Sequence, residues 1–245
     1  MKQILIIGAT SDMGMAFARL AAAQGYALSL AARDRVRLAQ LANDLRVRSD
    51  QPVETIYFDL LDMEAHASFY AGLEARPDIV ICFVGYLGDA ATCHRSFQAA
   101  REVIDTNYTG VVSIFDQVAE EFEARGSGTL VGVSSVAGDR GRAPRYHYGS
   151  AKAGLSAYLS GLRQRLYASG VHVVEVKPGY CRTKMVAGWN LPAAFTSEPD
   201  EVARAILKAV KQRRDVIYVR WIWRWIMMAI RWVPMPIFKR MKIGS

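Results

Sequence analysis

Residues 4–14 read Ile4-Leu-Ile-Ile-Gly8-Ala-Thr-Ser-Asp-Met-Gly14. The apolar run at the start is typical of a short strand that is buried on both faces of a parallel sheet. Small and apolar residues over 15–24 predict a helix directly after the glycines. This order is the context of a dinucleotide-binding turn, in which Gly8 permits the turn, Gly14 permits close helix packing, and the helix N-terminus faces a pyrophosphate.

Strands and helices continue to alternate along the chain to about residue 219. We expect further strands over residues 27–31, 53–58, 78–84, 129–133 and 171–176, and helices ending near residue 48 and over residues 94–125 and 148–168. This alternation predicts an α/β fold, a doubly wound parallel sheet (Rossmann fold) flanked by helices. We expect residues 1–219 to form one catalytic domain and residues 220–245 to form a basic, Trp-rich tail.

Composition narrows the class of protein. Apolar residues make up 51% of the chain and charged residues 22%, which excludes a disordered chain. Cys82, Cys93 and Cys181 are scattered without metal-ligand spacing, so we expect no metal site, no disulfide framework and a reduced, cytoplasmic compartment. The first strand is predicted to begin at residue 4, so we expect no secretion signal before it.

The net charge of +8 is concentrated at the end of the chain. From residue 211 onward there are nine basic residues and one acidic residue, so the first 210 residues are neutral. The basic residues alternate with Trp, Ile and Met, a mixture that favours a membrane surface over a nucleic acid. We therefore expect the tail, residues 220–242, to hold the protein peripherally at the inner face of a membrane.

An amphipathic helix is predicted at the start of this tail. On a helix, Arg220, Arg224 and Arg231 fall within about 40° of one another, and apolar residues occupy the opposite arc. Crossing a bilayer needs ~20 apolar residues, whereas Pro234 and Pro236 end this helix early. The helix is thus predicted to lie in the membrane surface; the alternative is a helix that covers the protein's own pocket or a second subunit.

Two residues one helical turn apart, Tyr148 and Lys152, are candidates for chemistry. Positions i and i+4 share a helix face, and a nearby ammonium lowers the pKa of a phenol, which otherwise titrates near ~10. Ser135 follows the strand over residues 129–133 and offers a hydroxyl at its carboxyl end. We expect His147, beside the tyrosine, to line the pocket wall.

With Asn107 on the preceding helix, this set resembles the short-chain dehydrogenase/reductase family. The resemblance also covers the turn at residues 8–14 and the Pro178-Gly179 loop with Thr183. It implies an NAD(P)-dependent oxidoreductase in which Tyr148 donates a proton, Ser135 binds the substrate oxygen and Lys152 tunes the phenol and holds the nicotinamide ribose. It further implies that Asn107 interrupts its helix and positions a water that leads to the lysine.

The resemblance also implies the cofactor-binding residues. They are Gly8, Thr10, Ser11, Asp12, Met13, Gly14, Arg33, Asp59, Leu60, Gly85, Tyr148, Lys152, Pro178, Gly179 and Thr183. Folds that prefer NAD place an acid after the second strand, but Ala32 and then Arg33 stand here, which favours NADP. The alternative is an arginine that merely caps a surface helix.

Two positions depart from the family pattern. Asp12 replaces the middle glycine of the turn, and a carboxylate repels a pyrophosphate unless it turns away to cap the helix. Cys82-Phe83-Val84-Gly85 stands where the family has Asn-Asn-Ala-Gly, so packing must replace the support of the asparagines. Because of both departures, a catalytically idle NADP-binding scaffold remains an alternative function.

Some stretches are similar to decaprenylphosphoryl-2-keto-pentose reductases, namely residues 85–89, 105–109, 138–145 and the tail. That resemblance implies a polyprenyl-phosphate-linked 2-keto sugar as substrate, supplied by a separate partner oxidase. Arg140, Arg142 and Arg145 would then meet a phosphodiester at the site mouth, or else they belong to a solvated loop. The enzymatic alternative is a reductase of another lipid ketone, such as a 3-keto sphingoid or acyl substrate. A homo-oligomer is also compatible with the sequence.

Overall fold

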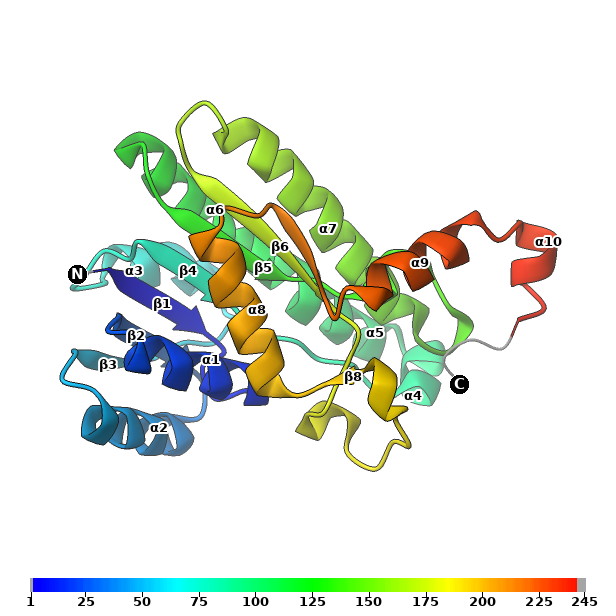
Figure 1. Cartoon of the computed structure of the whole chain (residues 1–245), viewed down its shortest axis with the longest axis horizontal. Coiled ribbons are helices and arrows are strands. Elements are labelled where there is room, and N and C mark those ends of the chain that lie inside the picture. Colours follow the sequence, from blue (N-terminus) through cyan, green and yellow to red (C-terminus); the bar gives the residue numbers. More distant parts are fainter. Residues whose placement is uncertain (1, 242–245) are drawn as a thin grey trace.

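The structure, a computed structural model that describes residues 2–241, is built on a seven-stranded parallel sheet (Figure 1). In order across the sheet the strands are β3 (Val53–Tyr57), β2 (Ala27–Ala32), β1 (Gln3–Ile7), β4 (Ile79–Cys82), β5 (Thr129–Val133), β6 (His172–Pro178) and β9 (Val216–Val219). All neighbouring pairs are parallel. The predicted doubly wound fold is therefore confirmed.

Helices cover both faces of the sheet (Figure 1). They are α1 (Asp12–Ala23), α2 (Arg35–Arg48), α3 (His66–Ala71), α4 (Ala90–Arg95), α5 (Phe97–Ile104), α6 (Gly110–Arg125), α7 (Tyr146–Leu166), α8 (Pro199–Lys211), α9 (Ile222–Trp232) and α10 (Met235–Phe238). The single helix expected over residues 94–125 is interrupted. Ser96 caps a new helix there by accepting from the backbone N–H of Ala99, and a π-helical turn follows over Asp105–Thr109.

The continuous apolar run of β1 is explained by its two buried faces. Ile4 and Ile6 pack with α1, α2 and α8 in one core cluster. Leu5 and Ile7 point to the other face and pack with α3, α6 and α7. Because successive side chains of a strand alternate between faces, both faces need apolar residues.

The strand order places a crevice beside β1. From β1 the chain passes to β2 and then to β3 on one side of β1, whereas β4 and the strands after it lie on the other side. The direction in which successive strands are added therefore reverses at β1. Ligands of open α/β sheets bind at such a reversal, beyond the carboxyl ends of the strands. The turn after β1, the segment after β4 and the segment after β5 all lie at this edge.

The C-terminal segment differs from its sequence-based description in one respect. The helix was expected to begin at Arg220, but α9 begins at Ile222, and Arg220 has φ 59°. Arg220 also donates to Glu201, so it does not belong to an outward arginine stripe. Within residues 2–241, no helix combines the length and apolar character needed to cross a membrane.

Candidate active site

A cleft for a dinucleotide lies at the carboxyl ends of β1, β2 and β4. Gly8 adopts φ 77°, and a Cβ there would lie 2.8 Å from the backbone nitrogen of Val84. A Cβ on Gly14 would lie 2.5 Å from the carbonyl oxygen of Gly8. Both positions therefore require glycine, because the turn, α1 and the end of β4 approach one another closely. This geometry fits a ligand, such as a pyrophosphate, that binds close to the backbone.

The N-terminus of α1 borders this cleft together with Thr10 and Met13. Ser11 caps the helix, accepting from the backbone N–H of Gly14 at 3.1 Å. Asp12 does not cap it. Its carboxylate accepts from the backbone N–H of Lys184 at 2.6 Å, so it tethers the segment after β6 to the turn after β1.

The far end of the cleft carries two arginines, Arg33 and Arg37. Arg33 is largely exposed and lies 3.9 Å from the carboxylate of Asp59. The alternative that Arg33 merely caps a helix is wrong, because Asp34 caps α2 by accepting from the backbone N–H of Arg37. Two guanidinium groups thus line this end of the cleft, and sequence reasoning had missed Arg37.

The catalytic candidates meet where this cleft joins a second, more apolar cavity. Ser135, Tyr148 and Lys152 line that cavity with Pro178 and Gly179. Ser135 follows β5 and begins a short 3-10 turn, accepting from the backbone N–H of Ala137 at 3.1 Å. Helix α7 presents Tyr148 and Lys152 on one face, as the spacing predicted, and the lysine nitrogen lies 5.8 Å from the centre of the phenol ring.

The electrostatics differ from the expectation that the lysine lowers the pKa of the phenol. Burial raises the pKa of Tyr148, and hydrogen bonding with Ser135 and the positive charge of Arg142 oppose that shift only in part. Burial lowers the pKa of Lys152 to about 8. The Lys152 ammonium donates to the carbonyl oxygen of Val133 at 2.9 Å, so in this arrangement it is directed to the backbone and not to the phenol.

Asn107 is fully buried in the π-helical turn between α5 and α6. Its amide donates to the carbonyl oxygens of Tyr86 and Val103 at 2.5 and 2.8 Å. A Cβ on Gly85 would lie 3.4 Å from the Asn107 oxygen and 4.0 Å from the Lys152 nitrogen. The predicted helix interruption is confirmed, and it holds the segment after β4 against the lysine.

Packing supports the central strand, as expected from the departure at residues 82–84. Phe83 is buried and its ring lies 5.7 Å from that of Phe17 on α1. Its backbone N–H donates to the carbonyl oxygen of Ile7 at 2.8 Å. An apolar contact between β4 and α1 therefore stands where the family has asparagines.

Residues 2–193 match the short chain dehydrogenase family. This match covers most of the chain and includes every catalytic candidate. The chain belongs to the short-chain dehydrogenase family. It is an oxidoreductase of that family, and the similar proteins described next cover the C-terminal segment as well.

Two similar proteins and one solved structure illustrate the relationship. The chain is 35% identical over 241 residues to an uncharacterized oxidoreductase of Mycobacterium tuberculosis, covering 97% of this chain and 96% of that protein. It is 36% identical over 246 residues to another from Streptomyces coelicolor, covering 99% and 96%. A short-chain dehydrogenase from Sphingobium yanoikuyae in complex with NADPH has a TM-score of 0.83 and 27% identity, covering 100% of this chain and 98% of that one.

The apolar cavity of this short-chain dehydrogenase has walls that sequence reasoning missed. They include Leu87, Tyr180, Met185, Val186, Trp189 and Trp223. Most belong to the segment between β6 and α8, and Trp223 comes from α9. No local motif marks them, because they come from segments that are distant in the sequence. Trp223 reaches the cavity because the inner face of α9 packs on Val136, in agreement with the alternative that this helix covers the protein's own pocket.

Two residues near the mouth lie elsewhere than expected. His147 does not line the cavity; its ring packs on Tyr146, with ring centres 4.1 Å apart. Arg140 does not face the mouth either, because its guanidinium donates to the carbonyl oxygen of Val233 at 2.7 Å. Arg142 and Arg145 do line the cavity, and the anion contact expected of them stays a prediction.

A buried ionic cluster lies behind the candidate catalytic serine, Ser135. Lys177 is 2.6 Å from Asp139 and 3.3 Å from Glu175. Glu175 accepts from the hydroxyl of Ser134 at 2.7 Å. Because Ser134 directly precedes Ser135, the cluster fixes the end of β5 that carries the candidate hydroxyl, and it balances charges whose burial would otherwise be costly.

Proposed function

We propose that the chain is an NADPH-dependent reductase of a keto group on a lipid-linked substrate, specifically a polyprenyl-phosphate-linked 2-keto sugar. The proposal that the chain is a reductase is supported by one observation above all. Ser135, Tyr148 and Lys152 converge where the dinucleotide cleft joins the apolar cavity. A scaffold that only bound a dinucleotide would not need a proton donor in that position. The idle-scaffold alternative is therefore the weaker one.

The residues divide the reaction between them. A bound NADPH supplies a hydride to the carbonyl carbon. Tyr148 donates its phenolic proton to the carbonyl oxygen, which Ser135 holds by a hydrogen bond, so the ketone becomes a secondary alcohol. Lys152 holds the nicotinamide ribose and, when charged, favours the phenolate that remains. Arg33 and Arg37 bind the 2′-phosphate, which charge-assisted hydrogen bonds recognise well.

The cavity supports a substrate with an apolar part and an anionic group. Its lining is mainly apolar, and Arg142 lies close enough to Tyr148 to influence the pKa of the phenol. Within residues 2–241, Arg142 makes no side-chain hydrogen bond or ion pair, whereas Arg145 donates to the carbonyl oxygen of Gly88. Arg142 is thus the preferred contact for the phosphodiester. A separate oxidase would supply the keto group by oxidising the 2-hydroxyl.

The C-terminal segment places the enzyme at the inner surface of a membrane, where a polyprenyl chain would remain in the bilayer. Residues 221–241, which include α9, expose several large apolar side chains beside basic ones, including Trp221, Trp225, Trp232 and Ile237. Exposed tryptophans and cations suit the headgroup region of an anionic leaflet.

The deciding experiment follows NADPH oxidation by the purified full chain with a polyprenyl-phospho-2-keto-pentose. Turnover is expected with this substrate and not with the matched 2-hydroxy sugar phosphate. The other candidate, favoured by the apolar cavity, is a reductase of a 3-keto sphingoid or acyl substrate. Turnover of that ketone with none of the keto sugar would replace the proposed substrate and keep the reductase.

A further inference from the structure

Helix α9 lies against both segments that form the mouth of the substrate cavity. Residues 179–198 follow β6 and carry Met185, Val186 and Trp189 on the cavity wall. Residues 136–145 connect the catalytic serine to α7 and carry Arg142. A single helix at the protein surface therefore contacts both sides of the opening.

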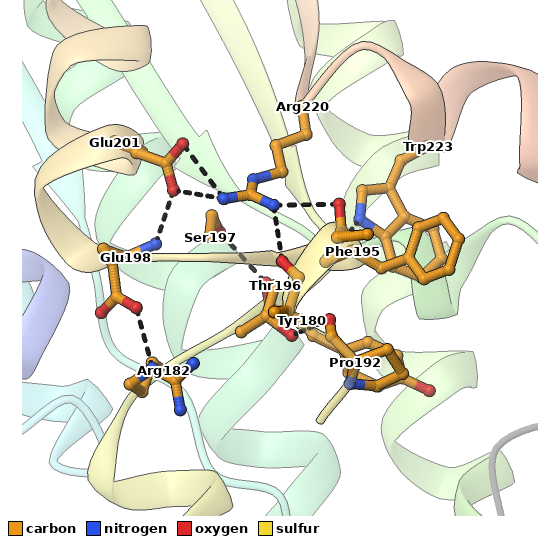
Figure 2. A network of polar contacts seen from close by, with 12 residues as sticks. Tyr180, Arg182, Pro192, Phe195, Thr196, Ser197, Glu198, Glu201, Arg220 and Trp223 are labelled. Carbon is orange, nitrogen blue, oxygen red and sulfur yellow. Dashed lines mark hydrogen bonds and ion pairs between the residues drawn. The ribbon is translucent and has the colours of Figure 1, made fainter. Parts of the chain in front are cut away.

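The beginning of α9 is fastened to the first of these segments (Figure 2). The indole N–H of Trp223 donates to the carbonyl oxygen of Phe195 at 3.0 Å. The guanidinium of Arg220 donates to the carbonyl oxygens of Ala193 and Ala194 at 2.8 and 2.9 Å and lies 3.0 Å from Glu201. Arg220 has a left-handed backbone, a strained arrangement for a non-glycine residue that persists only where its surroundings impose it.

The end of α9 is fastened to the second segment by Arg140. Its guanidinium donates to the carbonyl oxygens of Ile230 and Val233, the latter at 2.7 Å, and lies 3.7 Å from the ring centre of Phe238. A cation at a helix C-terminus satisfies carbonyl groups that have no partner within the helix. Arg140 thus joins the loop before α7 to the far end of α9.

The inner face of α9 is part of the cavity wall. Trp223 and Met227 are buried against Val136, the residue after the catalytic serine. A Cβ on Gly179 would lie 2.0 Å from the Trp223 indole nitrogen, so the indole occupies space that only a glycine leaves. A displacement of α9 would therefore move the wall of the cavity itself.

The outer face of the same helix is suited to an anionic lipid surface. Trp221 and Trp232 are 73% and 82% exposed. They line a groove with Arg214, Arg224 and Arg231, and within residues 2–241 none of these three arginines has an acidic partner. Tryptophans beside unpaired cations match the headgroup boundary of an anionic membrane better than they match water.

We propose that α9 couples this lipid contact to the substrate cavity, with Arg220 and Arg140 as positioning residues. Contact of the outer face with anionic lipid fixes α9, and α9 holds both segments of the mouth in the arrangement that binds the ketone. The expected effect is a lower KM for the ketone at a membrane surface, with little change in kcat. The proposal rests on the membrane attachment proposed above and adds a regulation of the same site.

The test uses the full chain, NADPH and a water-soluble ketone, so that substrate delivery by the vesicle plays no part. Vesicles of phosphatidylcholine with phosphatidylglycerol should lower the ketone KM by about fivefold, the lower end of typical coupling between sites. Vesicles of phosphatidylcholine alone should change it little. Flotation of the same samples reports binding independently of activity.

Variants separate the two faces of the helix. Trp221→Ser with Trp232→Ser should abolish flotation and the fall in KM while leaving the KM in solution unchanged. Arg220→Gln should keep flotation, raise the KM in solution and lose the response to vesicles. Arg224→Gln is the matched control on the same helix and should leave the KM in solution unchanged. If thermal unfolding shows that Arg220→Gln is unstable, Arg140→Gln serves in its place, because it removes the other contact between α9 and the mouth of the cavity.

Each outcome decides the proposal. Flotation with an unchanged KM would overturn the coupling and leave the membrane attachment standing. Absence of flotation would overturn both, while NADPH oxidation in solution would still support the reductase. A KM that falls with protein concentration in the absence of lipid, together with dimer formation, would show that a second copy of the chain is the occupant and would overturn the lipid proposal.

Discussion

The dinucleotide cleft and the substrate cavity share lining residues such as Gly85 and Thr183, but the two regions are built differently. The cleft is formed largely by backbone at the carboxyl ends of strands, within turns such as residues 8–14 and 83–86. The cavity is formed by side chains from distant segments, among them Trp189 and Trp223. The chemistry thus depends on the sheet, whereas the choice of ketone depends on segments that the sheet only supports.

The largest effect is expected at Tyr148, the candidate proton donor in the cavity. Tyr148→Phe removes the transferred proton and little volume, so NADPH affinity should stay the same while kcat falls by about 10²- to 10⁴-fold. Cofactor affinity by fluorescence titration and single-turnover hydride transfer would measure the two quantities separately. Tyr146→Phe, two residues earlier on the same helix and outside the cavity, is the matched control and should keep its rate. Unchanged chemistry in Tyr148→Phe would contradict the assignment.

A second prediction concerns the cleft alone. Arg33→Ala should raise the KM for NADPH by about tenfold, since a charge-assisted hydrogen bond to the 2′-phosphate is lost in an exposed position. The KM for NADH and the ketone should change little. Arg35→Ala is the control, because Arg35 stacks on Tyr57 outside the cleft. Equal losses for NADPH and NADH would show that Arg33 does not read the phosphate.

The cleft could be predicted from the sequence because its requirements are local. Gly8 and Gly14 lie within one turn, and the structure gives each a steric reason. Tyr148 and Lys152 are one helical turn apart, so their common face follows from helix geometry. Asn107 was identified through the family resemblance, which implied that it interrupts its helix, and the π-helical turn confirms that interruption.

The cavity could not be predicted because its contacts are far apart in the chain. Arg220 was placed on an amphipathic stripe by its spacing, but its pairing with Glu201 and with residues 193–194 ends that pattern. Arg140 was expected at the mouth, but it binds the end of α9 about 90 residues away. Periodicity describes one element at a time, and these positions are fixed by contacts between elements.

A third prediction concerns pH, and it tests the lysine that lines the cavity. Burial lowers the pKa of Lys152 to about 8, so the ammonium is present below that pH and lost above it. The pKa of Tyr148 is raised, so its proton is retained in the same range. The kcat/KM for ketone reduction should therefore fall as the pH rises through about 8, approaching tenfold per unit. Lys152→Arg, which stays charged, should be slower but lack this fall; a flat wild-type profile would contradict the role of the ammonium.

The smallest expected effect concerns Asp12, which belongs to both regions. It stands in the glycine turn, where its charge repels a pyrophosphate, and it tethers the cavity segment by accepting from the backbone N–H of Lys184 at 2.6 Å. Asp12→Asn keeps an acceptor without the charge and should lower the KM for NADPH alone. Asp12→Gly should also raise the ketone KM by about threefold, since a half-exposed hydrogen bond contributes about 1 kcal/mol or less. Steady-state kinetics with each substrate varied would separate the two effects. If both variants change only the KM for NADPH, Asp12 acts in the cleft and the tether has no part in substrate binding. If only the KM for the ketone changes, the carboxylate is directed away from the phosphates throughout the reaction.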